Sequence, residues 1–130
     1  MQILQPPGWP RPKGYSNGIE AEGKLIFVAG QVGWNEQERF QAADFPGQFE
    51  QALRNILAVL AEADAGPEHI VRMTWYVTDK DSYLGNLKEI GRIYRDLMGR
   101  NYPVMAVVMV AGLVEDGALI EIEATAVAPR

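Results

Sequence analysis

The chain has 130 residues, of which 48% are hydrophobic and 22% are charged, and its formal net charge is −5; this composition indicates one globular domain and excludes a disordered chain. Its longest apolar run, Val104–Leu113, is far shorter than the roughly 20 residues of a membrane-spanning helix, so we expect a cytoplasmic protein that contacts no membrane. The absence of cysteine excludes thiol chemistry and cysteine-bound zinc, and the single histidine excludes a two-histidine metal site within one chain.

The first residues are predicted to form an arm followed by a β-hairpin. Residues 1–14 hold four of the eight prolines, and because each proline removes a backbone donor, we expect an arm without a regular ladder, ahead of one domain over 15–130. The patterns of Tyr15–Glu20 and Leu25–Ala29 predict two paired strands around a tight turn. Two glycines in the next stretch, Gly30–Trp34, suggest a bulge or a close backbone approach.

A helix and a strand are predicted next. Apolar residues at spacings of three and four predict a helix over Phe45–Ala63, with Asp44 as its N-cap and Gly66-Pro67 as its stop. The stretch Ile70–Thr78 is rich in β-branched and aromatic residues, which is typical of a strand.

The remaining elements are a second helix and two strands. An apolar stripe that begins after Asp79 or Asp81 and stops at Gly99 predicts the helix. The strands are Val104–Val110 and Ala118–Val127, and the turn residues between them favour an antiparallel pair.

This order of elements predicts an α+β domain in which two helices cover one face of a sheet. The strand Val104–Val110 is apolar at every position, and Ile70–Thr78 carries apolar residues on both sides, so we expect both faces of the sheet to be buried. Another copy of the chain is the simplest cover for the second face. We therefore expect an obligate homo-oligomer.

The last strand carries the most informative polar residues. Because side chains alternate along a strand, Ile120 and Ile122 are expected beneath the helices, whereas Glu121 and Glu123 face the side that the oligomer would cover. A carboxylate there is costly unless it has a partner. Two interpretations are open: both glutamates form ion pairs across the sheet, or one of them positions water or acts as a general base.

Other residues are candidates for a pocket, each with a plainer alternative. Tyr15 is either a half-buried aromatic residue or a hydroxyl donor in the pocket. Asn86 is unusual inside a predicted helix, where the alternative is a surface position. Trp34 either packs in the domain or lines the rim of a cavity. His69, in a connecting turn, is expected to be exposed and not catalytic.

Several separate segments together resemble one known family. They are Gly14-Tyr15-Ser16-Asn17-Gly18, Val28-Ala29-Gly30-Gln31, Gln51-Ala52-Leu53-Arg54-Asn55-Ile56, Asn86, Tyr102-Pro103 and Ile120-Glu121-Ile122-Glu123-Ala124. In this order and spacing the chain is similar to the RidA family, also called YjgF/YER057c/UK114, from about Gly14 to Val127. The resemblance implies a chorismate-mutase-like subunit of the ferredoxin-like βαβ type, assembled as a homotrimer with a small-molecule cleft at each interface.

The resemblance also implies a chemistry. The best-known members hydrolyse reactive imines and enamines, such as 2-aminoacrylate, without a metal or cofactor. An imine carbon is already electrophilic, so a site needs only to orient it, polarise the nitrogen and hold one water. By position, Glu121 is expected to orient that water. With the candidates above, the expected substrate-binding residues are Tyr15, Ala29, Gly30, Trp34, Asn86 and Met105.

Two positions depart from the family pattern. Where imine-deaminating members carry an arginine that grips the substrate carboxylate, this chain has Met105, and a thioether cannot replace hydrogen bonds of about 1.5 to 3 kcal/mol each. Ala29 stands where the family has a serine, so the pocket loses a hydroxyl. We expect a more apolar substrate than 2-aminoacrylate, unless Arg39, Arg72 or Arg100 supplies the clamp.

Two functions of different classes follow. The first is a cofactor-independent hydrolase or deaminase, in which Glu121 activates water against a small imine, enamine or amide-like metabolite. The alternative is a non-catalytic trimer that binds a small metabolite or has a regulatory role. A third, ribonuclease, is a historical label within the family, and the acidic composition argues against it, so we expect no nucleic-acid partner.

Overall fold

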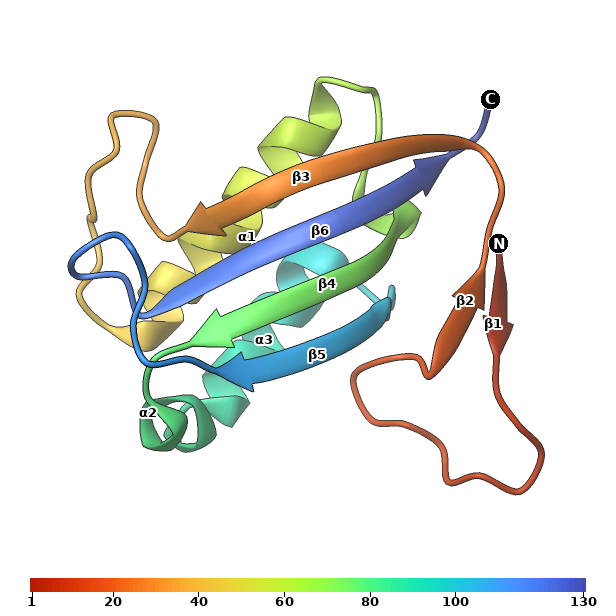
Figure 1. The fold of residues 1–130 in the computed structure, drawn as a ribbon, viewed down its shortest axis with the longest axis horizontal. Coiled ribbons are helices and arrows are strands. Elements are labelled where there is room, and N and C mark those ends of the chain that lie inside the picture. The colour runs from red at the N-terminus through yellow and green to blue at the C-terminus, as the bar shows by residue number, and fades with distance from the viewer.

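The main sheet of the computed structural model, which describes residues 1–130, has four strands in the order β3-β6-β4-β5. They are β3 (Lys24–Val32), β6 (Ile120–Ala128), β4 (Ile70–Val77) and β5 (Val104–Met109). The central strand β6 runs antiparallel to both of its neighbours, whereas β4 and β5 are parallel. Figure 1 shows β3 and β5 at the two edges of this sheet.

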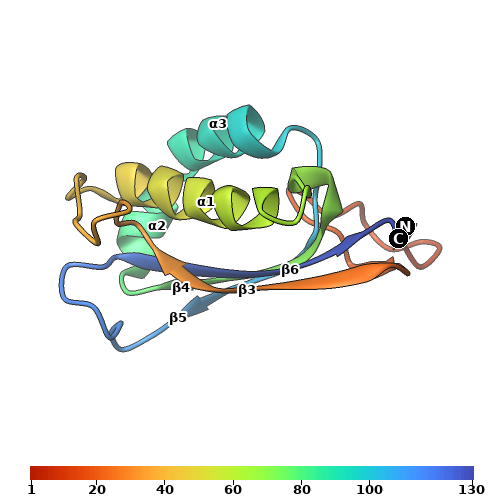
Figure 2. The same cartoon turned by 90° about the horizontal axis from the view of Figure 1, so that it is seen from above.

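Both long helices lie on one face of the sheet (Figure 2). Helix α1 (Phe45–Ala61) begins after Asp44, whose carboxylate accepts a hydrogen bond of 3.3 Å from the backbone of the first turn, as predicted. Helices α2 (Lys80–Gly85) and α3 (Leu87–Met98) carry the chain from β4 to β5. Parallel strands need such a helical crossover, so this connection explains why β4 and β5 are parallel.

The core lies between these helices and the sheet. Phe49 of α1 packs edge-on against Trp75 of β4, with ring centroids 4.8 Å apart. Along β6, buried residues alternate with residues of the opposite face, where Glu121 and Glu123 lie. The predicted alternation of this strand is therefore confirmed.

The predicted antiparallel pairing of the last two strands is wrong. A turn does form before β6, with Gly117 at φ +85°, but the chain then crosses to the centre of the sheet instead of returning along β5. In the centre, β6 satisfies the backbone hydrogen bonds of β3 on one side and β4 on the other. Local turn chemistry cannot reveal this arrangement, because it depends on strands far away in the chain.

The predicted N-terminal hairpin is also wrong. The strands β1 (Gln2–Leu4) and β2 (Gly18–Glu20) pair with each other in a separate two-stranded sheet, so residues 1–14 do contribute to a ladder. The four prolines of this segment are compatible with it because all of them lie in the loop between β1 and β2. Strand β3 pairs with β6 instead.

The second predicted helix is divided at Asn86. This residue ends α2 and begins α3, and its side-chain Nδ2 donates a hydrogen bond of 2.7 Å to the carbonyl of Ser82. Asp79 caps α2, and Gly99 ends α3 with φ +64°, both as predicted.

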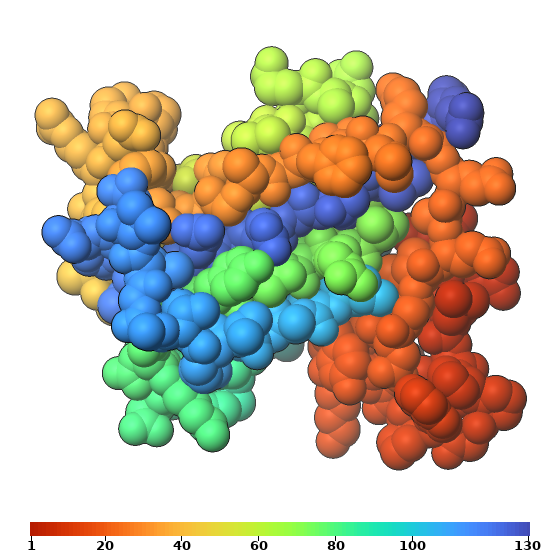
Figure 3. Space-filling view, viewed as in Figure 1, coloured from red at the N-terminus to blue at the C-terminus, as the bar shows by residue number.

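The sheet face that points away from the helices is open (Figures 2 and 3). Leu25 and Phe27 of β3 are 63% and 72% exposed on the subunit, and Val108 of β5 is 40% exposed. The chain itself therefore does not provide the burial expected for this face. No helix in residues 1–130 combines the length and apolar character needed to cross a membrane.

Candidate functional site

On the open face, Glu121 lies beside a bulge in β3. The pairing of β3 with β6 shifts between Val28 and Gln31, and a Cβ atom on Gly30 would lie 2.3 Å from Oε2 of Glu121. The predicted bulge and close approach at Gly30 are confirmed. Glu121 is half-buried, forms no ion pair and accepts no hydrogen bond within the subunit. Both of its carboxylate oxygens are therefore free to bind water or a ligand.

The neighbouring carboxylate, that of Glu123, already has a hydrogen-bond partner. The Tyr76 hydroxyl donates a hydrogen bond of 2.6 Å to Glu123, and this bond, followed by burial, raises the pKa of Tyr76. Neither Glu121 nor Glu123 forms an ion pair with lysine or arginine in the subunit. Of the two predicted outward carboxylates, Glu121 is therefore the one available for chemistry.

Replacing Gly30 with alanine is expected to displace the Glu121 carboxylate. The added methyl group meets only the end of a flexible side chain, so the free energy of unfolding should change by about 0.5 kcal/mol or less. Any activity that needs Glu121 in place should fall about tenfold or more, because small displacements of a reacting group are costly. Urea denaturation and a rate assay measure the two effects, with Gly85→Ala, which meets open space, as the control. An unchanged rate in Gly30→Ala would contradict the importance of this contact.

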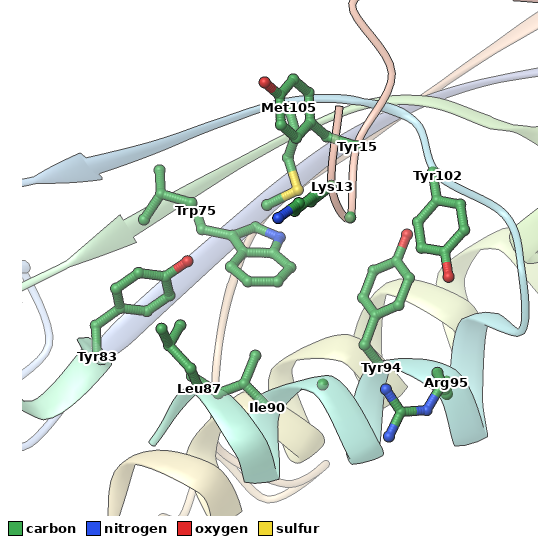
Figure 4. Close-up of a pocket in the computed structure, with 13 residues that line it drawn as sticks. Lys13, Tyr15, Trp75, Tyr83, Leu87, Ile90, Tyr94, Arg95, Tyr102 and Met105 are labelled. Atoms are coloured by element: carbon green, nitrogen blue, oxygen red, sulfur yellow. The ribbon is translucent and has the colours of Figure 1, made fainter. Parts of the chain in front are cut away.

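On the helix side of the sheet, a cavity of about 620 Å³ lies between β5 and α3 (Figure 4). This volume is typical of small-molecule sites. Ser16 fixes the preceding segment beside β5, because its N–H donates a hydrogen bond of 3.1 Å to the Pro103 carbonyl. Tyr15 and Lys13 thereby reach the cavity. The apolar and aromatic part of the wall includes Trp75, Tyr83, Tyr94, Tyr102, Met105 and Val107.

Two tyrosines of this cavity, Tyr83 and Tyr94, are partly buried. Burial raises the pKa of both Tyr83 and Tyr94. The Tyr94 hydroxyl donates a hydrogen bond to the Asn101 carbonyl, and its ring stacks on Tyr102 with centroids 5.8 Å apart. Trp75 is only 4% exposed, and its buried Nε1–H has no hydrogen-bond partner. Because leaving such a group unpaired costs about 1–3 kcal/mol, this indole is the most unusual polar group of the core.

The structure divides the predicted site residues between the two faces of the sheet. Tyr15 and Met105 line the cavity beside α3. Glu121 and Gly30 lie together on the open face, and Ala29 lines a depression of about 380 Å³ on that face. Since β4 lies between β5 and β6, the two groups do not meet within one subunit.

Asn86 and Trp34 do not line the cavity. The Asn86 side chain is bound to the Ser82 carbonyl, and it is the next residue, Leu87, that lines the cavity wall. The Trp34 ring packs against Phe40, with centroids 5.8 Å apart. In the isolated subunit both residues thus have structural contacts, and their binding roles stay predictions.

Of the three arginines considered as substitute clamps, Arg72 comes nearest to the predicted site. It lines a second cavity of about 230 Å³ together with Tyr15 and Met105. Arg39 and Arg100 line neither cavity.

Lys13, Trp75 and Arg95 are cavity residues that the sequence analysis does not identify. Trp75 follows the pattern of a core strand, and Lys13 lies in a segment predicted to be an arm. Only Arg95 could have been found from the sequence. It is four residues after Gly91 and therefore lies on the same side of α3. Its Nη1 would be 3.5 Å from a Cβ atom on Gly91.

Gly91 is an unusual residue for the middle of a helix. A Cβ atom here would make only the ordinary contact with Arg95. Gly91→Ala is therefore expected to raise the free energy of unfolding by about 0.5–1 kcal/mol, because alanine loses less backbone entropy on folding. Urea denaturation measures this change, and Gly99→Ala, at φ +64°, is expected to lower stability instead. A destabilised Gly91→Ala variant would contradict the free space assigned to this position.

No group of three or more histidine, cysteine, aspartate or glutamate side chains is arranged to hold a metal ion. The single histidine, His69, lies in the short 3₁₀ helix η1 (Pro67–His69). Its side chain is 21% exposed, less than predicted, because Nδ1 accepts a hydrogen bond of 3.0 Å from the Gly66 N–H. His69 thus caps a turn and lines neither cavity.

Comparisons with known proteins bear on this fold and these motifs. A family model described as endoribonuclease L-PSP matches residues 10–128. A RutC family protein of Pyrococcus abyssi is 34% identical over 119 residues, which cover 90% of this chain and 89% of that protein. A solved protein of unknown function of the conserved Rid protein family, YyfB from Yersinia pestis, has a TM-score of 0.86 at 31% identity and covers 98% of both chains. The chain belongs to the RidA family.

Two further solved structures are similar to this RidA-family chain. A YjgF/YER057c/UK114 family member from Mycobacterium tuberculosis is 34% identical, with a TM-score of 0.66, and the match covers 88% of this chain and 87% of that one. TdcF from E. coli, solved with bound serine, is 29% identical, with a TM-score of 0.69 and coverage of 98% and 99%. The family resemblance and the α+β fold expected from the sequence are confirmed.

Proposed function

We propose that this RidA-family chain is a cofactor-independent hydrolase or deaminase that adds water to a small imine, enamine or amide-like metabolite. The observation that carries the proposal is the Glu121 carboxylate, which lies against Gly30 and is free of ion pairs and hydrogen bonds within the subunit. A carboxylate with free oxygens can accept a proton from water as the water attacks.

The proposed reaction of an imine has two steps. First, the water oxygen bonds to the imine carbon, one proton of the water passes to Glu121, and the C=N electron pair moves to the nitrogen, which then takes that proton from Glu121. Second, Glu121 takes the hydroxyl proton of the carbinolamine and passes it to the nitrogen, so that the hydroxyl becomes a carbonyl as the C–N bond breaks and ammonia leaves. Glu121 ends as it began, so no cofactor or oxidant is needed.

We also propose that the chain acts as a homotrimer. A neighbouring copy on the open face would cover Leu25 and Phe27, and it could bring its own cavity residues, Tyr15 and Met105, to Glu121. The expected solution mass is three times the chain mass of 14.4 kDa, measured by light scattering. Phe27→Lys should shift the mass toward that of the monomer, whereas Val59→Lys, on the helix side, should not. A monomeric wild-type protein would contradict the proposal.

Met105 supports a substrate other than 2-aminoacrylate. A thioether offers no charge to a carboxylate and favours an apolar group. The test is the rate of ammonia release from imines generated in situ, with acid-derived and uncharged imines compared in the presence of a semicarbazide trap. Faster release from uncharged imines alone would support Met105 as the specificity change. Faster release from acid-derived imines would mean that another cation binds the carboxylate, and no acceleration of either would contradict the hydrolase.

The second candidate is a trimer that binds a small metabolite without turnover, and the cavity of about 620 Å³ favours it. The similarity to TdcF, solved with bound serine, is compatible with a small-molecule ligand. Tight binding of a metabolite without any product would support this candidate over the hydrolase. Ribonuclease activity, after which the matching family model is named, gains little support, because the chain has a net charge of −5.

A further inference from the structure

The cavity between β5 and α3 has positive charge and unpaired donors. Lys13 and Arg95 both line it, and neither forms an ion pair, although the chain has 17 acidic residues and 12 basic ones. No aspartate or glutamate lines the cavity. Trp75 also lines the cavity, although its unpartnered Nε1–H is itself fully buried. Cations without partners are complementary to an anionic group.

The rest of the wall suits a bulky apolar or aromatic group. Figure 4 shows Trp75 in the middle of the cavity, with Met105 on one side and Leu87 and Ile90 of α3 on the other. Aromatic rings pack well against an indole and against a thioether. A volume of about 620 Å³ is also much larger than an acid of three carbon atoms requires.

Gly91 enlarges this cavity from the helix side. It lines the wall next to Arg95, and a Cβ atom here would make no close contact. Neither helix geometry nor crowding therefore requires a glycine at this position. The missing side chain leaves room for a ligand beside the guanidinium of Arg95.

We propose that this cavity binds a carboxylate ligand with an aromatic body, whose ring packs against Trp75 and Met105 and whose charge is balanced by Lys13 and Arg95. The cations that pair with the ligand are thus Lys13 in the N-terminal segment and Arg95 in α3, and no cation is needed at position 105. This inference rests on the proposed function only because Tyr15 and Met105 line this cavity and also belong to the proposed hydrolase site. Its test measures binding instead of turnover.

Three probes test the proposal by isothermal titration calorimetry of the full chain: 3-phenylpropanoate, its uncharged amide, and propanoate. We expect 3-phenylpropanoate to bind at least about tenfold tighter than either of the others, because only it offers both the charge and the ring. The double variant Lys13→Met/Arg95→Met should lose about tenfold in affinity for the acid and no longer prefer it to the amide. Equal affinity of the acid and the amide for the wild-type protein would overturn the proposal.

A cavity-filling variant locates the binding site. Gly91→Leu places a side chain in the cavity and should weaken binding of 3-phenylpropanoate by about tenfold or more. The matched control is Gly85→Leu, which adds the same side chain where nothing lies within 4 Å and should bind as the wild type does. Wild-type affinity in Gly91→Leu would overturn the proposal. If Gly91→Leu fails to fold, the double variant Lys13→Met/Arg95→Met, which changes only exposed residues, still tests whether the cavity binds the acid.

The two proposals fail in different ways. Binding of 3-phenylpropanoate without hydrolysis of any imine would contradict the hydrolase and leave the carboxylate site intact. Imine hydrolysis by a protein that does not prefer the acid to the amide would contradict the carboxylate site alone.

Discussion

Ammonia release is expected to fall at least about 100-fold when Glu121 is replaced by glutamine. Glutamine keeps the size of the side chain but cannot take a proton from water, and general-base catalysis typically contributes a factor of about 10²–10⁴. Because Glu121 forms no ion pair in the subunit, the free energy of unfolding should change by less than about 1 kcal/mol. The measurement is kcat/KM on the imine that the wild-type protein converts fastest.

Glu123→Gln is the matched control for this experiment. Glu123 lies on the same strand and the same face, but it is hydrogen-bonded to Tyr76. Its replacement should leave kcat/KM within about threefold of the wild type, since an exposed polar substitution rarely matters. Equal rates for Glu121→Gln and the wild type would refute the role of Glu121 and favour the binding trimer.

The largest expected loss of stability follows replacement of Gln48 with leucine. Gln48 is 1% exposed, and its Nε2 donates hydrogen bonds of 3.2 and 2.9 Å to the carbonyls of Ala42 and Gly117. Its Oε1 accepts a third, of 2.8 Å, from the N–H of Leu119. Leucine fills the space but leaves these backbone groups unpaired, so the free energy of unfolding should fall by about 3 kcal/mol or more.

Urea denaturation measures this loss, and Gln41→Leu provides the control. Gln41 is exposed and forms no side-chain hydrogen bond, so its replacement should change the free energy of unfolding by about 0.5 kcal/mol or less. If Gln48→Leu were as stable as Gln41→Leu, the hydrogen bonds of Gln48 to Gly117 and Leu119 would not hold the turn before β6 in place.

The elements of the fold are well predicted by the sequence, because their signals are local. The helix α1 follows from apolar spacing and from the cap at Asp44, although it ends at Ala61 instead of the predicted Ala63. The alternation along β6 likewise requires only its own residues. Strand pairing is not local, since β6 joins β3 and β4 across most of the chain, and both predicted hairpins are therefore wrong.

The candidate site is only partly predicted by the sequence, because some of its features are local and others are not. The contact of Gly30 with Glu121 agrees with the motifs that contain them, and Tyr15 and Met105 share a cavity as their family positions suggest. That these two pairs lie on opposite faces depends on how the alternation of β5 is aligned with that of β6 through β4, and no local pattern carries this alignment. The unpaired indole of Trp75 is also beyond sequence reasoning, because a core tryptophan and a cavity tryptophan have the same pattern.

The central place of β6 also affects how the molecule is assembled. During synthesis β3, β4 and β5 leave the ribosome before residues 120–128. Because β6 lies between β3 and β4, β3 has no strand that connects it to β4 and β5 until β6 is in place. Closing the sheet then requires contacts between distant parts of the chain, such as Lys24 opposite Ala128, and folds with many such contacts form slowly. Until β6 inserts, the inner edges of β3 and β4 are unpaired and are open to association with other chains.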